Sequence, residues 1–403
     1  MKFKMTTEEK NWVLYDVGNS AFVLLVSTII PIYFNYLAEK AGLSSVDYLA
    51  FWGYTASLVT IIVAFLGPVL GTVADTKDYK KPLFTMMLLI GCIGCFLLGF
   101  INYWFVFLIV FLIAKIGFSG SLIFYDSMLI DVTTPKRVDH VSSQGYAWGY
   151  IGSCVPFVIC LGLVLGASKI GLSMEMSMII SFAIIALWWF CLTLPLLKTY
   201  KQKYYVERQP KAIANSFKRL GTTLKNIRKE KKIFLFLLAF FFYIDGVYTI
   251  IDMATAYGTA LGFESTSLLL ALLLTKVLFG RLATKYNTSK LIVICILAYL
   301  GISIFAIFLT RQWQFWVLAI LVGMFQGGIQ SLSRSYFTKI IPSEKSGEYF
   351  GLMDVCGKGA SFLGTTMISV LSQWTGQVNL SLGALSIFFI LGILFFKMSE
   401  KSI

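Results

Sequence analysis

The chain of 403 residues is 58% hydrophobic and only 13% charged, with a mean hydropathy of +0.79. No soluble domain of this size needs so many apolar residues, so the composition excludes an ordinary soluble protein and predicts that the bilayer is the solvent. The net charge of +14 would suit nucleic acid, but the stretch 198–232 alone holds 12 Lys/Arg against two Glu. We therefore interpret the charge as a signal of membrane topology and expect no nucleic-acid partner.

Apolar runs long enough to cross a bilayer recur along the whole chain. A helical span needs about 20 residues, and charge-bounded runs of that length predict twelve spans, at residues 12–37, 50–74, 82–102, 104–126, 142–168, 175–197, 233–261, 265–284, 290–310, 313–339, 346–373 and 378–398. The eighth is the weakest, because Lys276 and Arg281 interrupt it. The first is too long for a cleaved signal sequence and is expected to stay in the mature protein.

The distribution of Lys and Arg between loops predicts the orientation. An internal N-terminus leaves only Lys40, Lys169 and Arg311 in external loops. Both termini and the central basic stretch are therefore expected on the cytoplasmic side. The predicted domains are a six-helix bundle at 1–197, a basic linker at 198–232 and a second six-helix bundle at 233–403.

The two halves carry traces of a duplication. Tyr15-Asp16 of span one is echoed by Tyr243-Ile244-Asp245 of span seven, and the loop after span two, Gly71 to Asp75, is echoed by Gly280 to Thr284 after span eight. A parallel repeat of six helices around a basic central loop is typical of major facilitator transporters. The predicted fold is an all-α membrane protein with twelve transmembrane helices in two six-helix pseudo-repeats.

Three segments resemble the "unknown major facilitator" branch of that superfamily more specifically. They are Trp12-x-x-Tyr15-Asp16-x-x-Asn19-Ser20-Ala21-Phe22, Tyr243-Ile244-Asp245-Gly246-Val247, and Gly327-Gly328-Ile329-Gln330-Ser331-Leu332-Ser333-Arg334-Ser335 with Pro342-x-Glu344-Lys345. The branch includes the fungal vacuolar amino-acid effluxers linked to autophagy, and the resemblance covers essentially the whole chain. It implies secondary transport of a small solute, favours export, and suggests the bacterial cytoplasmic membrane as the location.

The loops after spans two and eight depart from the family pattern. The first keeps the acidic residue as Asp75 but has Asp78 where a glycine is usual, and the second has Thr284 in place of the acid. Asp75 is expected to latch onto the N-terminal end of span eleven, where the helix carries partial positive charge. The second copy lacks this charge, so we expect an asymmetric gate. In the first half, Asp16 and Gly71 are 55 residues apart, whereas the corresponding Asp245 and Gly280 of the second half are only 35 apart. We therefore expect part of span eight to be missing.

Polar residues inside the predicted spans are the candidates for solute binding, because each is costly there unless it faces a cavity or a partner. Spans one, four, seven and ten line the cavity in the family that the sequence resembles. The candidates on those spans are Asn19, Lys115, Asp245, Asp252, Gln326, Gln330 and Arg334. Lys115 or Arg334 would bind a carboxylate and Asp245 an ammonium group, which suits an amino acid or a related zwitterion. The alternative is that these charges pair with one another and serve packing or gating.

Proton coupling is a second hypothesis, because a buried carboxylate can take up a proton. Asp245 is the first candidate for it and Asp16 the second. The predicted gating residues are Asp75, Lys80, Lys81, Asp354 and Lys358. The last two stand four residues apart on span eleven, in the order that favours an ion pair within the helix.

Other classes of function find less support. The seven cysteines lie in apolar runs, the only histidine lies in a loop, and the chain has no HExxH, GxSxG or P-loop pattern, so we expect no enzyme, metal site or cofactor. A lipid or amphiphile flippase and a non-transporting membrane sensor stay open, because a fold does not fix a function. Besides the solute, the expected partners are protons and membrane lipids, and the expected state is a monomer. The basic linker fits a solvated loop better than a site for anionic lipid, although Ile213 to Ile227 could form a short surface helix.

Overall fold

The computed structural model describes residues 4–208, 212–260, 288–375 and 378–402. Ten helices in these ranges are long and apolar enough to cross a membrane, and each corresponds to one predicted span. The eleventh predicted span corresponds to α13 (Ser346–Thr375), and the eighth, 265–284, lies outside the described residues. The chain is therefore an all-α membrane protein, as its hydropathy predicts.

The chain divides into two compact units, which are considered one at a time. Unit 1 consists of Met1–Thr134, Gln144–Ser216 and Ser343–Gly351, and unit 2 of Pro135–Ser143, Phe217–Pro342 and Leu352–Ile403. Each unit contains most of one half of the sequence together with a short segment from the other half. The first turns of α13 thus belong to unit 1, and the first turn of α6 belongs to unit 2.

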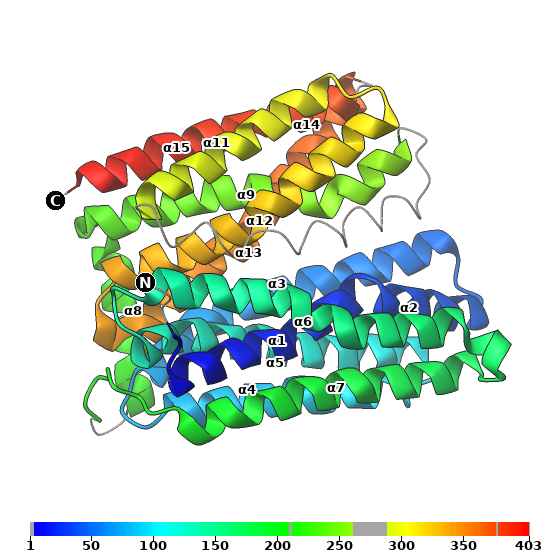
Figure 1. The fold of residues 1–403 in the computed structure, drawn as a ribbon, viewed down its shortest axis with the longest axis horizontal. Helices are drawn as coiled ribbons and strands as arrows, with labels where there is room; N and C mark the ends of the chain where they lie inside the picture. The colour runs from blue at the N-terminus through cyan, green and yellow to red at the C-terminus, as the bar shows by residue number, and fades with distance from the viewer. Residues whose placement is uncertain (1–3, 209–211, 261–287, 376–377, 403) are drawn as a thin grey trace. The chain divides into compact units, whose positions relative to one another are not determined.

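The first half of the sequence forms seven long helices and one short turn. They are α1 (Thr7–Ser27), α2 (Ile29–Lys40), α3 (Ser45–Ala74), α4 (Lys80–Leu98), α5 (Trp104–Val132), α6 (Val138–Leu165), η1 (Ala167–Ile170) and α7 (Met174–Thr199). Within unit 1, α4 packs along α5, α7 packs against α1 and α4, and α3 packs against α5 (Figure 1).

Aromatic side chains fill the core between α1, α5 and α7. Trp12 stacks on Tyr125 with ring centroids 4.3 Å apart, and Phe22 stacks on Trp189 at 5.4 Å. The Trp12 indole N–H donates to the Tyr125 carbonyl at 2.9 Å, which gives this buried indole the hydrogen-bond partner it needs. This packing fixes the positions of the helices that carry the polar residues described below.

The first predicted span is not one continuous helix. The helix is interrupted at Thr28, whose φ is −134°, so that α1 ends before this residue and α2 begins after it. Pro31 explains the break, because a proline ring clashes with the carbonyl four residues earlier and has no N–H to donate. The Thr28 hydroxyl donates to the Leu24 carbonyl at this point.

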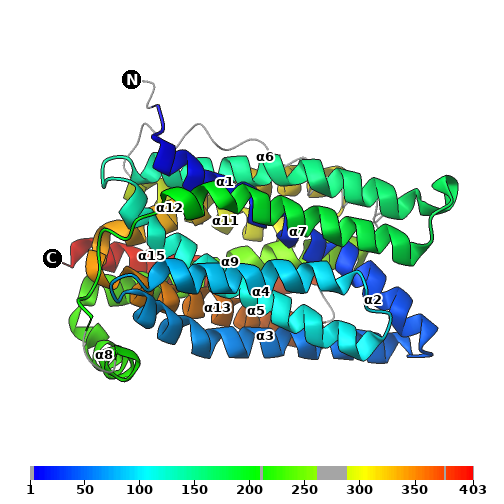
Figure 2. The ribbon, with the colours of Figure 1, turned by 90° about the horizontal axis from the view of Figure 1, so that it is seen from below.

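The second half of the sequence begins with a surface segment. The described elements of this half are α8 (Ala212–Asn226), η2 (Ile227–Lys229), α9 (Lys231–Ala260), α11 (Thr288–Ile307), α12 (Gln312–Ile340), η3 (Ser343–Lys345), α13 (Ser346–Thr375), α14 (Val378–Ala384) and α15 (Ser386–Lys401). In unit 2, α15 packs along α9, and α11 packs against α12, α14 and α15 (Figures 1 and 2).

One contact recurs in both units and supports the duplication. In unit 1 the Tyr15 hydroxyl lies 2.7 Å from the Ser121 hydroxyl, and in unit 2 the Tyr243 hydroxyl lies 2.6 Å from that of Ser333. All four side chains are buried. The partners are 106 residues apart in the first copy and 90 in the second, so the second copy is shorter between them. This agrees with the expected shortening around span eight.

Candidate functional site

The Asp75 carboxylate caps the start of α13 in unit 1. Its two oxygens accept hydrogen bonds from the backbone N–H groups of Gly347 and Glu348, at 2.7 and 2.8 Å. These are among the N–H groups at the helix start that have no partner within the helix, and the helix dipole favours negative charge there. The contact expected from the sequence is present, and its role in gating stays a prediction.

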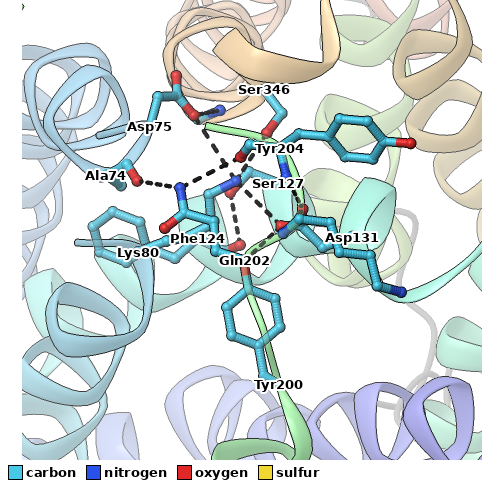
Figure 3. A network of polar contacts seen from close by, with 12 residues as sticks. Ala74, Asp75, Lys80, Phe124, Ser127, Asp131, Tyr200, Gln202, Tyr204 and Ser346 are labelled. Carbon is cyan, nitrogen blue, oxygen red and sulfur yellow. Dashed lines mark hydrogen bonds and ion pairs between the residues drawn. The ribbon is translucent and has the colours of Figure 1, made fainter. Parts of the chain in front are cut away.

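Lys80 lies beside Asp75 and links it to a second buried carboxylate. The Lys80 ammonium is 3.8 Å from Asp75 and 3.5 Å from Asp131, and it donates to the Ser346 hydroxyl at 2.9 Å (Figure 3). The side chains of all three charged residues have no exposed surface. Two carboxylates face one ammonium group, so the excess negative charge must be stabilised by other donors.

Those donors come from the first residues of the basic linker. The backbone N–H groups of Lys203 and Tyr204 donate to one oxygen of Asp131 at 2.9 and 3.0 Å, and the Tyr200 hydroxyl donates to the other at 2.6 Å. Burial and the neighbouring Asp131 carboxylate hold the pKa of Tyr200 well above its ordinary value, so the hydroxyl keeps its proton. The buried Asp131 carboxylate thus receives hydrogen bonds at both of its oxygens.

We call residues 200–208 the strap, because they bind the loop between α3 and α4 as well as Asp131. The Val206 N–H donates to the Asp75 carbonyl at 2.7 Å, and the Lys77 N–H donates to the Val206 carbonyl at 3.1 Å. The Gln202 amide donates to the Ala74 carbonyl at 3.1 Å (Figure 3). The beginning of the linker is therefore an ordered part of unit 1, whereas the sequence predicted a solvated loop.

Two glycines let α3 and the start of α13 approach closely. A Cβ atom on Gly71 would meet the Gly347 carbonyl group, and one on Gly347 would meet the Gly71 carbonyl and the Asp75 carboxylate. The backbones touch at this point, which brings the N–H groups of α13 within reach of Asp75. Gly71 and Asp75 thus serve the same contact with the start of α13: the glycine lets the two backbones touch, and the aspartate binds the N–H groups.

The structure also explains the departure at Asp78, the residue that stands where a glycine is usual. Its φ is +65°, in the left-handed region that glycine adopts without steric cost. Asp78→Gly is therefore expected to raise the free energy of unfolding by up to about 1 kcal/mol, and Asp78→Val to lower it by about 1–2 kcal/mol. Denaturation of both purified variants beside the parent protein tests this. A stabilising valine would contradict the strain argument.

In unit 2 the start of α6 is held by cations from α12. Arg334 is buried and donates to the Ser142 hydroxyl and carbonyl, both at 3.0 Å. Lys339 forms an ion pair with Asp139, which also accepts a hydrogen bond from Thr288. Thr284, on which the expected asymmetry rested, lies outside the described residues. The two helix starts are nevertheless held by opposite chemistry, a carboxylate for α13 and cations for α6.

Asp245 lies on α9 in the interior of unit 2 and has no exposed surface. One carboxylate oxygen accepts hydrogen bonds from the Thr249 hydroxyl at 3.2 Å and from the Gly364 N–H at 3.0 Å. The other oxygen, Oδ2, is buried and has no hydrogen-bond partner among the described residues. A buried carboxylate oxygen without a donor is costly, which makes this the strongest candidate for a functional carboxylate.

The other predicted solute-binding residues lie on the expected helices. Asn19 on α1 is buried, and its amide nitrogen lacks a hydrogen-bond partner within the described ranges. Lys115 on α5 is half-buried, with its ammonium 4.9 Å from the centre of the Phe118 ring. Gln326 and Gln330 on α12 are also half-buried. Asp252 lies on α9, but its side chain is outside the described part of the structure.

The remaining predicted residues fall into different environments. Asp16 is buried on α1. Lys81 is exposed, so only Lys80 of the predicted lysine pair joins the buried network. Asp354 and Lys358 form the expected ion pair within α13. Their roles in coupling and gating stay predictions.

Sequence reasoning missed Asp131 and the strap. Asp131 lies at the end of α5, where a carboxylate is normally solvated, so its position gave no sign of burial. The strap lies in a stretch whose charge suggested a loop. Their contacts join residues 69 to 73 positions apart, and no local pattern marks a pair at that separation.

The fold is the one that transporters of the major facilitator superfamily have. The solved structure of the transporter FucP matches with a TM-score of 0.74 at 14% identity and covers 98% of both chains. The human organic anion transporter MFSD10 matches with a TM-score of 0.69 at 15% identity, over 97% of this chain and 98% of that one. At such identities the likeness shows the fold alone.

The family model described as "Vacuole effluxer Atg22 like" matches residues 5–402, and the chain belongs to this family of transporters. The MFS-type transporter YxiO of Bacillus subtilis, described as uncharacterized, is 41% identical over 405 residues, which cover 98% of this chain and 95% of the relative. Autophagy-related protein 22-1 of Aspergillus niger is 24% identical over 275 residues, 60% of this chain and 44% of the fungal protein. The chain is thus an integral membrane protein with a bacterial relative along its whole length.

Proposed function

We propose that the protein is a secondary transporter that exports a small polar solute, an amino acid or a related zwitterion, by alternating access. The family supports a transporter, and its effluxer description supports the direction. The substrate class rests on the residues themselves. The single observation that carries it is the buried carboxylate of Asp245, with one satisfied oxygen and one free of described partners.

The free oxygen of Asp245 can do one of two things. It can accept hydrogen bonds from the ammonium group of a solute, which would pair the buried charge and repay its desolvation. Alternatively it can take up a proton, which would neutralise the carboxylate and couple transport to a proton gradient. We keep Asn19, Lys115, Gln326 and Gln330 as further candidates for solute binding.

The test is Asp245→Asn, which keeps the shape of the side chain and removes its charge. Losing a hydrogen bond to a charged group weakens binding by about 1.5–3 kcal/mol, or roughly 10- to 100-fold. Purified protein is screened by thermal shift against amino acids, peptides, sugars and lipids, because a ligand that binds only the folded state raises the melting temperature. An amino acid that stabilises the parent protein should fail to stabilise the variant.

Reconstitution in liposomes separates the two roles of Asp245. If the residue carries the proton, the variant exchanges labelled for unlabelled solute but no longer follows an imposed pH gradient. If it binds the ammonium group, both activities are lost. Asp47→Asn, at an exposed position in the first turn of α3, serves as the matched control and should behave like the parent protein. Unchanged transport in Asp245→Asn would remove the residue from the mechanism, and stabilisation by lipids alone would favour the flippase.

A further inference from the structure

The helix α8 (Ala212–Asn226) in the basic linker has one packed face. Ser216, Leu220 and Thr223 are buried, and their spacing of four and three residues places them on the same side of the helix. The sequence suggested a short surface helix at this place, and the structure contains it.

The strip next to the packed face exposes two large apolar side chains. Phe217 is 54% and Leu224 is 52% exposed, and at seven residues apart they lie almost directly above one another. A single exposed apolar residue needs no explanation, but two that extend the apolar sector of an amphipathic helix do. In a protein that already spans a bilayer, the nearest apolar phase for them is the membrane surface.

Basic side chains border this strip and follow it. The exposed cations of the segment are Lys218, Lys225, Arg228, Lys229, Lys231 and Lys232. None of these six forms an ion pair with any residue in the described ranges. The segment 212–232 contains seven Lys/Arg and only one acidic residue, Glu230. The charge of the six exposed cations is therefore available to attract an anionic surface.

We propose that α8 lies in the membrane surface, with Phe217 and Leu224 among the headgroups and the six cations bound to anionic phospholipids. Both halves of the proposal follow from the same helix: the apolar strip supplies partitioning into the interface, and the cations supply selectivity for negatively charged lipid. The binding partner of α8 is thus one leaflet of the membrane, the one that the distribution of Lys and Arg predicts to face the cytoplasm. This role is independent of the solute and of Asp245.

Photo-crosslinking of the full-length protein in lipid nanodiscs tests the proposal. A benzophenone amino acid replaces Phe217 in one variant and Thr222 in another; Thr222 is also exposed, but its five-residue offset turns it away from the apolar strip. In discs that contain phosphatidylglycerol, position 217 should crosslink to lipid and position 222 should not, as read by the mass of the labelled peptide. Equal lipid labelling at the two positions, or labelling of the chain itself from position 217, would overturn the proposal.

The contribution of charge is measured with a second variant and a second lipid. Changing Lys218, Lys225, Arg228 and Lys229 to glutamine removes four exposed cations without touching the buried face. Below saturation, each basic side chain changes partitioning roughly fivefold, so the loss of four should weaken it by about two orders of magnitude or more, and lipid labelling from position 217 should fall by at least about tenfold. It should fall similarly when phosphatidylcholine replaces all of the phosphatidylglycerol. Labelling that is insensitive to both changes would sink the proposed recognition of anionic lipid.

Discussion

Replacing Asp131 with alanine is expected to lower the free energy of unfolding by about 3–5 kcal/mol, because the change leaves Lys80 as a buried charge that has lost its second carboxylate. The same change also removes the acceptor for the Tyr200 hydroxyl and for two strap N–H groups. Reversible denaturation of the purified protein in mixed micelles measures the loss.

Two tyrosines of the strap provide graded controls for Asp131→Ala. Tyr200→Phe removes one hydrogen bond to a charged group and should cost about 1.5–3 kcal/mol. Tyr204→Phe should be close to neutral, because Tyr204 contacts Asp131 through its backbone N–H and the residue is 41% exposed. If Asp131→Ala cost no more than Tyr204→Phe, the buried network would not contribute to stability.

Gly71→Ala is expected to open the contact between α3 and the start of α13. The added methyl group would overlap the Gly347 carbonyl, and since both neighbours are backbone, neither can rotate away. Overpacking of this kind costs about 1–3 kcal/mol. The displaced N–H groups of Gly347 and Glu348 would leave Asp75, so hydrogen exchange in the peptide that covers the start of α13 should accelerate.

Gly53→Ala is the matched control, because Gly53 lies on the same helix and a Cβ there meets nothing within 4 Å. Alanine is the better helix former by about 1 kcal/mol, so this variant should be neutral or slightly more stable. Exchange at the start of α13 should stay at the parent rate. Equal acceleration in both variants would mean that hydrogen exchange reports general loosening and not the Gly71–Gly347 contact.

Hydropathy predicted the helices well because each span must satisfy its own backbone hydrogen bonds within the bilayer. The predicted run 313–339 is the helix Gln312–Ile340, and 175–197 is Met174–Thr199. The break in the first span required attention to Pro31, whose effect on the preceding turn overrides a continuous apolar run. Length and hydropathy alone cannot show such a break.

The candidate site was predicted only where local rules apply. The Asp354–Lys358 pair follows from helical spacing, and the Asp75 contact follows from a carboxylate that meets a helix start. The choice between Lys80 and Lys81 depends on which of two adjacent side chains points inward, and the structure decides it. The strap depends on contacts made only after the bundle has formed, so no sequence pattern could show it.

The charged residues around the strap form a buried set and a surface set, and the two should differ in their response to salt. Lys80, Asp75 and Asp131 are fully buried, so mobile ions cannot reach them, and their attraction should persist at any ionic strength in the cell. The pairs Lys203–Glu8 and Lys77–Glu207 lie at the surface, where salt screens them. A rise in salt concentration should therefore weaken the ion pairs at the edge of the strap and leave its hydrogen bonds to Asp131 intact.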